Sequence, residues 1–218
     1  SVKIGGTGDR YKTFQLINNV GIYGGFAGSE TSRNQRDWVN NVAILSGDIG
    51  TQGNDIYNCY HVFYHPSGTN LDSTAILDGV TITGGLADGT YPHVHGGGMF
   101  NYHSSPTLNT VTFSGNQAHI HGGGIYNRGW LSLTNSTMSG NKATYSGGGV
   151  YIFHSSATLN VSQGKVGNNS ASEGGGVYVH WGSVTLSGTQ MVSNSASSNG
   201  GGMYVSRDSA TLNVSGGE

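Results

Sequence analysis

Five glycine triplets divide the second half of this chain into segments of nearly equal length. They begin at Gly96, Gly122, Gly147, Gly174 and Gly200, so their spacings are 26, 25, 27 and 26. Each triplet is followed by an aliphatic residue or Met and then by an aromatic residue. A fixed period of this length indicates a repeat fold, in which each unit buries its apolar side against its neighbours. Long helices are excluded because the triplets interrupt the sequence too often.

Two further columns of residues follow the same period. A Leu recurs at Leu108, Leu133, Leu159, Leu186 and Leu212, and an apolar residue three positions before an Asn recurs at Phe113, Met138, Val166 and Met191. Each period therefore contains three short segments of alternating pattern, separated by Gly, Ser and Asn turns. We predict an all-β fold, a right-handed parallel β-helix with three strands per coil of about 26 residues and roughly eight coils in all.

The whole chain, residues 1–218, is expected to form a single β-helix domain. Residues 76–218 carry the regular repeats, and residues 1–48 carry looser N-terminal coils. Within them, charged residues cluster in residues 29–38, which predicts a cap-like loop because only 9% of the chain is charged. Residues 76–85 match residues 107–116 at an offset of 31, which predicts a turn insertion in residues 88–91. The last residues stop partway through a repeat, so we expect a segment of a longer protein.

Composition and charge exclude several classes of protein. The formal net charge of −2 argues against a nucleic-acid binder or a polybasic membrane-surface module. A single cysteine, Cys59, excludes an intrachain disulfide framework and a cysteine-based zinc module. No stretch of about 18 apolar residues is present, so no membrane-spanning helix is expected. No cofactor is expected either.

Alternation along a strand places the residue after each triplet inside and the following aromatic residue outside. The aromatic residues expected on this exposed face are Phe100, Tyr102, Tyr126, Tyr151, Phe153, Tyr178 and Tyr204. Arg128 and His180 are expected to share the face. Such a row could bind sugar rings or a partner chain, since contiguous exposed apolar surface marks interaction sites. Stacking between neighbouring coils would explain the same row structurally.

Four asparagines repeat at one position of the coil. They are Asn116, Asn141, Asn169 and Asn194. We expect a structural ladder of side-chain amides at a turn, each bonding the next and satisfying the turn backbone.

Four histidines precede two successive triplets. His93 and His95 stand at the same distance before the first of these triplets as His119 and His121 stand before the second. Four imidazoles one coil apart would suit zinc, copper or nickel. No carboxylate joins them at the same spacing, so no metal is expected and the four are only a weak candidate site.

The regular coils lack the residues that polysaccharide-cleaving enzymes need. Those enzymes use clustered carboxylates as acid and base or as Ca²⁺ ligands. Between Gly96 and Gly202 the only acidic residue is Glu173. The chain is therefore not expected to be an enzyme, and a polysaccharide lyase or hydrolase is the minority alternative.

Two motifs resemble a known class of surface protein. Gly97-Gly98-Met99 and Phe113-Ser114-Gly115-Asn116 are similar to the repeats of the polymorphic outer membrane proteins of chlamydiae and of related right-handed β-helix surface proteins of environmental bacteria. Residues 23–31 are similar to a segment that commonly precedes such repeats in large secreted bacterial proteins. The resemblance implies a bacterial protein that is secreted or lies at the cell surface, with a structural or adhesive role.

We therefore predict an extracellular structural or adhesive β-solenoid. It would associate with itself, as filaments or a sheath, or with other surface proteins or extracellular glycans, and not with nucleic acid. A carbohydrate-binding module that uses the aromatic face is the main alternative.

Overall fold

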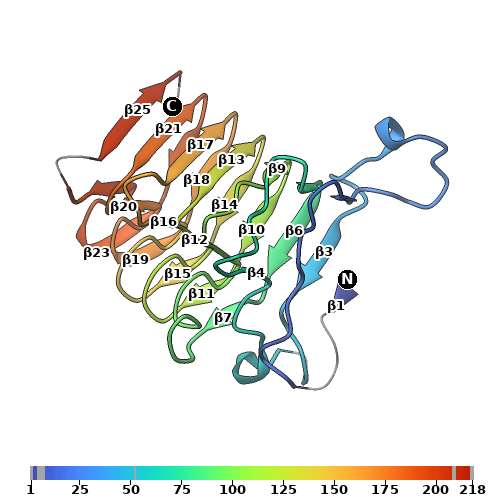
Figure 1. Cartoon of the computed structure of the whole chain (residues 1–218), viewed down its shortest axis with the longest axis horizontal. Helices are drawn as coiled ribbons and strands as arrows, with labels where there is room; N and C mark the ends of the chain where they lie inside the picture. Colours follow the sequence, from blue (N-terminus) through green and yellow to red (C-terminus); the bar gives the residue numbers. More distant parts are fainter. Residues whose placement is uncertain (1, 4–7, 52, 208–209, 217–218) are drawn as a thin grey trace.

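The computed structural model describes residues 2–3, 8–51, 53–207 and 210–216. These residues form four parallel sheets that run along a stack of coils (Figure 1). Sheet A contains β1 (Val2–Lys3), β3 (Ala43–Ser46), β6 (Val80–Thr83), β10 (Thr112–Ser114), β14 (Thr137–Ser139), β18 (Lys165–Gly167) and β22 (Gln190–Val192). Sheet B contains β4 (Phe63–His65), β8 (Met99–Asn101), β12 (Ile125–Asn127), β16 (Val150–Ile152), β20 (Val177–Val179) and β24 (Met203–Val205).

The other two sheets complete each coil. Sheet C contains β2 (Gly21–Tyr23), β5 (Ile76–Asp78), β9 (Thr107–Asn109), β13 (Trp130–Thr134), β17 (Thr158–Ser162), β21 (Ser183–Ser187) and β25 (Thr211–Ser215). Sheet D contains the short strands β7 (Leu86–Ala87), β11 (Gln117–Ala118), β15 (Lys142–Ala143), β19 (Ser170–Glu173) and β23 (Ser195–Asn199). The helical elements described are two 3₁₀ turns, η1 (Arg33–Gln35) and η2 (Asp55–Tyr57).

The all-β parallel solenoid is confirmed, but the coil count and the number of strands per coil were wrong. Five complete coils begin at β4, β8, β12, β16 and β20, with about 28 residues each, instead of roughly eight coils. Each complete coil has four strands instead of three, because the residues that follow the sheet A strand and its turn pair as sheet D instead of remaining a turn. The part of the chain before β4 adds only partial coils, since much of its length lies in loops.

The strand register confirms one predicted column and corrects another. Phe113 pairs with Met138, which pairs with Val166, as predicted. Ile82 pairs with Phe113, so the longer offset between these two coils is also confirmed. Leu133, however, pairs with Val161 instead of Leu159. The five-residue strands of sheet C have two inward positions, and sequence spacing alone does not distinguish them.

The inward side chains form one continuous core along the stack. Phe63, Phe113 and Met138 are among its largest fully buried members. Apolar burial of this kind is the main stabilising contribution, and each coil supplies it to both neighbours.

The glycine triplets are required by the packing of successive coils. The first glycine has a positive φ, as in Gly122 at 68°, which residues with a side chain adopt at a cost. A Cβ on the third glycine, Gly124, would lie 2.6 Å from the carbonyl oxygen of Gly149 in the next coil. Only glycine allows the backbones to approach this closely.

Residues 29–38 form a loop, with η1 inside it, that projects from the N-terminal end of the stack (Figure 1). Glu30 accepts hydrogen bonds from the backbone amides of Ala27 and Gly28. Arg36 forms an ion pair of 2.6 Å with Asp78, the last residue of β5. This ion pair is mostly buried, so it fixes the loop to the first complete coil.

Candidate functional site

Sheet B carries a row of stacked aromatic side chains on the side facing away from the core. The ring centroids of Phe100 and Tyr126 are 5.2 Å apart, with an interplanar angle of 9°. Tyr126 and Tyr151 are 5.5 Å apart, and Tyr151 and Tyr178 are 5.2 Å apart. Tyr204 continues the row with a tilted ring. We call these five residues the inner aromatic row.

The expectation that this row is exposed was wrong. Phe100, Tyr126, Tyr151 and Tyr178 are buried, with 2–7% of their surface exposed, and Tyr204 is half-buried. The imidazoles of His95 and His121 cover it on one side, stacking on Tyr126 at 4.8 Å and on Tyr151 at 4.2 Å. Burial raises the pKa of Tyr126 and Tyr151 above the usual value of a tyrosine.

A second row covers the other side, two residues further along each strand. We call Tyr102, Arg128, Phe153 and His180 the outer row; all four are half-buried. The guanidinium carbon of Arg128 lies 4.3 Å from the ring centroid of Tyr102 and 5.1 Å from that of Phe153. The shared face predicted for these four residues is present, and a ligand of sheet B would touch this row first.

The four ladder asparagines form a continuous chain of amide hydrogen bonds. Asn116 donates to Asn141 at 3.0 Å, Asn141 to Asn169 at 3.0 Å, and Asn169 to Asn194 at 2.9 Å. Each Nδ2 also donates to a backbone carbonyl of the preceding coil, as Asn141 does to Phe113. The first three are fully buried. Their amides satisfy backbone groups that water cannot reach.

A second, shorter ladder was missed by the sequence reasoning. Asn101 donates to Asn127 at 2.8 Å, and both are fully buried at the ends of β8 and β12. His65 lies next to Asn101 at 3.3 Å, and burial lowers its pKa to about 4. The spacing of one period between Asn101 and Asn127 was the available signal.

The four histidines of the weak metal candidate do not come together. His95 and His121 stack in parallel, with centroids 5.2 Å apart, and burial lowers their pKa values to about 4 and about 3. His119 is exposed, whereas His93 lies in the longer turn that follows β7, so the two are not equivalent in the stack. No three His, Cys, Asp or Glu side chains gather as a metal site within the part of the chain that the structure describes.

His93 instead contacts a histidine that sequence reasoning had not singled out. Nδ1 of the buried His61 lies 2.8 Å from the carbonyl oxygen of Gly96, and its Nε2 lies 2.9 Å from Nδ1 of His93. A carbonyl can only accept, so Nδ1 of His61 carries the proton and Nε2 accepts from His93. Desolvation lowers the pKa of His61 to about 3. This pair is a neutral structural contact at physiological pH.

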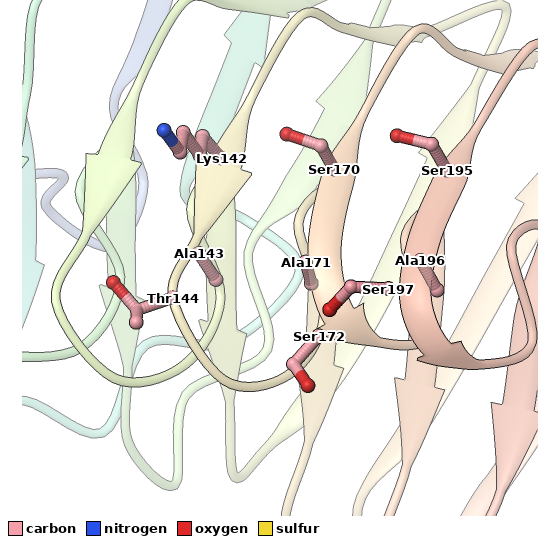
Figure 2. Close-up of a pocket in the computed structure, with 9 residues that line it drawn as sticks. All are labelled: Lys142, Ala143, Thr144, Ser170, Ala171, Ser172, Ser195, Ala196 and Ser197. Carbon is pink, nitrogen blue, oxygen red and sulfur yellow. The ribbon is translucent and has the colours of Figure 1, made fainter.

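Sheet D forms a groove of about 520 Å³ on its outer surface. Figure 2 shows Lys142, Ser170 and Ser195 in one row and Ala143, Ala171 and Ala196 in a second. Thr144, Ser172 and Ser197 also line the groove. Apart from Lys142, these side chains are small, and similar ones recur because successive coils repeat the same strand. The groove alone does not indicate a ligand.

Two stretches of the chain, residues 110–128 and 135–152, match the family model of the Chlamydia polymorphic membrane protein repeat. Two coils of this parallel β-helix are therefore similar to the polymorphic membrane protein repeat. No curated protein and no solved structure matches it.

The two matched stretches cover equivalent parts of two successive coils. Each runs from sheet A through the ladder asparagine and sheet D to the inner aromatic row of sheet B. Each matched stretch therefore contains one ladder asparagine, one glycine triplet and one residue of the inner aromatic row. Among the residues described, no helix has the length and apolar character needed to cross a bilayer.

Proposed function

We propose that this chain is the adhesive part of a bacterial surface protein, a stiff β-solenoid that holds outward-facing side chains in fixed positions. The observation that carries the proposal is the match of two successive coils to the polymorphic membrane protein repeat, in a chain whose coils are continuous with one another. The Asn ladder and the inner aromatic row connect these coils through contacts within the chain itself. Side chains on the outside are therefore preorganised for binding, which lowers the entropic cost of association.

The regular coils are poor in the carboxyl groups that an enzyme would need to cleave glycans. Glu173 is the only acidic residue between Gly96 and Gly202, and it lies beside Asn199 with a hydrogen bond to its side chain. General acid–base cleavage of glycans needs a second carboxyl group nearby. Binding without catalysis is the function we assign to these coils.

Surface display is tested by antibody labelling of intact and permeabilised cells of the source bacterium. Labelling of intact cells is expected, and labelling only after permeabilisation would contradict the proposal.

Adhesion is tested with beads that carry the chain through one terminal tag. They should bind host or bacterial cells several-fold better than beads that carry an unrelated β-helix of similar size. The adhesive role is wrong if the beads bind every cell type tried no better than the beads that carry the unrelated β-helix.

Self-assembly into filaments or a sheath stays a separate prediction. Negative-stain electron microscopy across a concentration series would reveal fibres or sheets if it is right, and isolated particles at every concentration if it is wrong.

A further inference from the structure

A small hollow lies where three successive coils turn from sheet B to sheet C. Its volume is about 260 Å³, and it is lined by His103, Ser105, Arg128, Gly129, Trp130 and Ser156. The turn between β12 and β13 has two residues, whereas the turns before β9 and β17 have five each. The two longer turns therefore form walls on either side of the shorter one.

The hollow is lined by Arg128, whose charge has no acidic partner among the residues that the structure describes. None of the ion pairs found among the described residues includes Arg128. Within the part of the chain that the structure describes, the buried Nε of Arg128 has no hydrogen-bond partner. Tyr102 and Phe153 hold the guanidinium between them. An arginine held in this way is suited to a planar anion such as a carboxylate.

Trp130, the first residue of β13, also lines the hollow and is fixed but not buried. The Trp130 side chain is 63% exposed, and its Nε1 donates to the carbonyl oxygen of Ser156 at 2.7 Å. Trp130 also lines a second hollow, of about 220 Å³, which shares Ser105 with the first. An exposed ring with a fixed orientation and open space beside it is suited to the C–H face of a sugar.

The remaining polar groups fit a hydroxyl-rich ligand. His154 lies 2.8 Å from the Ser156 hydroxyl through its Nδ1, and its ring packs edge-on against His103 at 5.4 Å. Among the residues with a described position, no acidic side chain lines either hollow. The surface is therefore cationic, aromatic and rich in hydroxyl groups, which favours an acidic sugar over a metal cation or a purely apolar ligand.

We propose that the hollow at Arg128 and Trp130 binds an oligosaccharide that contains uronic acid, with a carboxylate on Arg128 and a sugar ring against Trp130. The proposal rests on the adhesive function above and names its ligand class. The charged contact gives specificity for the acidic sugar, and the ring contact gives affinity for the saccharide backbone.

The test is calorimetric titration of the full chain with two uronate probes, a galacturonate tetramer and a hyaluronan tetrasaccharide. The carboxyl-reduced galacturonate tetramer serves as the neutral control, because it keeps the skeleton and loses only the charge. At least one uronate probe is expected to bind about 10-fold or more tightly than the neutral control. This preference should weaken with added salt.

Two variants separate the contacts. Arg128→Gln should weaken uronate binding by about 10-fold to 100-fold and abolish the preference over the neutral control. Trp130→Ala should weaken binding of the uronate probe by about 10-fold or more. Lys142→Gln on sheet D and Trp38→Ala in the N-terminal loop are the matched controls and should bind as the parent chain does. Unfolding temperatures identify any variant that has lost its fold, and Arg128→Lys provides a milder change at the same position.

Three outcomes would overturn the proposal. The first is that neither uronate probe binds. The second is that the neutral control binds as tightly as the uronate probe, and the third is that a short glutamate-rich peptide does so. If beads carrying the chain still adhere to cells in any of these cases, the adhesive function stands and only the ligand class is wrong. If beads fail to adhere but a uronate probe binds with the expected preference, the adhesive function is wrong and the site is retained.

Discussion

The side-chain amide of Asn141 donates to the side-chain oxygen of Asn169 at 3.0 Å, although the two belong to successive coils. Both residues are fully buried. Asn141 also accepts from the backbone amide and the side chain of Asn116, so one side chain bonds the coil before it and the coil after it. The ladder is thus a hydrogen-bonded spine between coils, beside the apolar core.

Replacing Asn141 with Ala should destabilise the chain strongly. The change leaves the buried backbone amide of Asn116 and the carbonyl of Phe113 without their partner, and each unsatisfied group costs about 1–3 kcal/mol. Urea unfolding should show that the free energy of unfolding falls by about 3 kcal/mol. The control, Asn160→Ala, changes an exposed Asn of β17 and should alter stability by less than about 0.5 kcal/mol. Equal stability of the two variants would mean that the ladder does not hold the coils together.

Replacing Gly124 with Ala should be far more costly than the same change at Gly202. The two glycines occupy the same place in their triplets. A Cβ on Gly124 would lie 2.6 Å from the carbonyl oxygen of Gly149. The contact described for a Cβ on Gly202 is with the end of the Met191 side chain, at 3.7 Å. Overpacking of this kind costs about 1–3 kcal/mol, measurable as a lower unfolding temperature of the Gly124→Ala variant. Similar unfolding temperatures would show that the coils can separate to admit the methyl group.

Replacing Tyr126 with Ala should lower the free energy of unfolding of the chain, because this side chain is part of the buried aromatic row. Tyr126 is buried against Phe100 and Tyr151, and truncating such a ring costs about 3–5 kcal/mol. Tyr145→Ala, at a side chain that is 54% exposed, is the control and should cost much less. Chemical denaturation of both variants measures the difference. A stable Tyr126→Ala variant would return the row to the candidate binding residues.

Acid should destabilise the fold well above the pH at which carboxylates are protonated. The folded pKa values of His95 and His121 are about 4 and about 3, below the ordinary value of 6.5, so the unfolded chain binds more protons between these limits. Their contribution is complete above pH 6.5 and falls by at most about 1.4 kcal/mol per group for each pH unit below it. Unfolding free energies measured from pH 8 to pH 4 should show this slope.

A single substitution tests the assignment of this slope. The His121→Phe variant keeps a ring against Tyr151 and removes one titrating group, so its stability should depend less steeply on pH. His119→Asn, at an exposed position, is the control and should keep the slope of the parent chain. An unchanged slope in His121→Phe would assign the acid sensitivity to other groups.

Cys59 should report the opening of the fold. Its thiol is fully buried and donates to the carbonyl oxygen of His61, and burial raises its pKa to about 12. At pH 8 a thiol with that pKa is ionised to about one part in 10⁴, and reagents react with the thiolate. Labelling by a maleimide should therefore be slow in native buffer and fast in urea. Rapid labelling of the native chain would show that this region opens easily.

The period of the sequence determined the type of fold and much of its register. Residues recurring at a fixed spacing, such as Phe113 and Met138, must lie in adjacent coils because every coil repeats the same backbone path. The same reasoning predicted the Asn ladder, since identical amides in one column can bond each other only along the stack. The longer offset between Ile82 and Phe113 likewise predicted the insertion after β7.

Only the tertiary structure decided what is exposed and what forms a site. Alternation along β12 shows that Tyr126 points away from the core, but His95 and the outer row cover it from other parts of the coils. The hollow beside Trp130 arises because a two-residue turn lies between two five-residue turns, a difference that no column of the repeat reveals. Periodicity specifies contacts between equivalent positions of successive coils, whereas burial and site shape depend on how unlike positions pack across them.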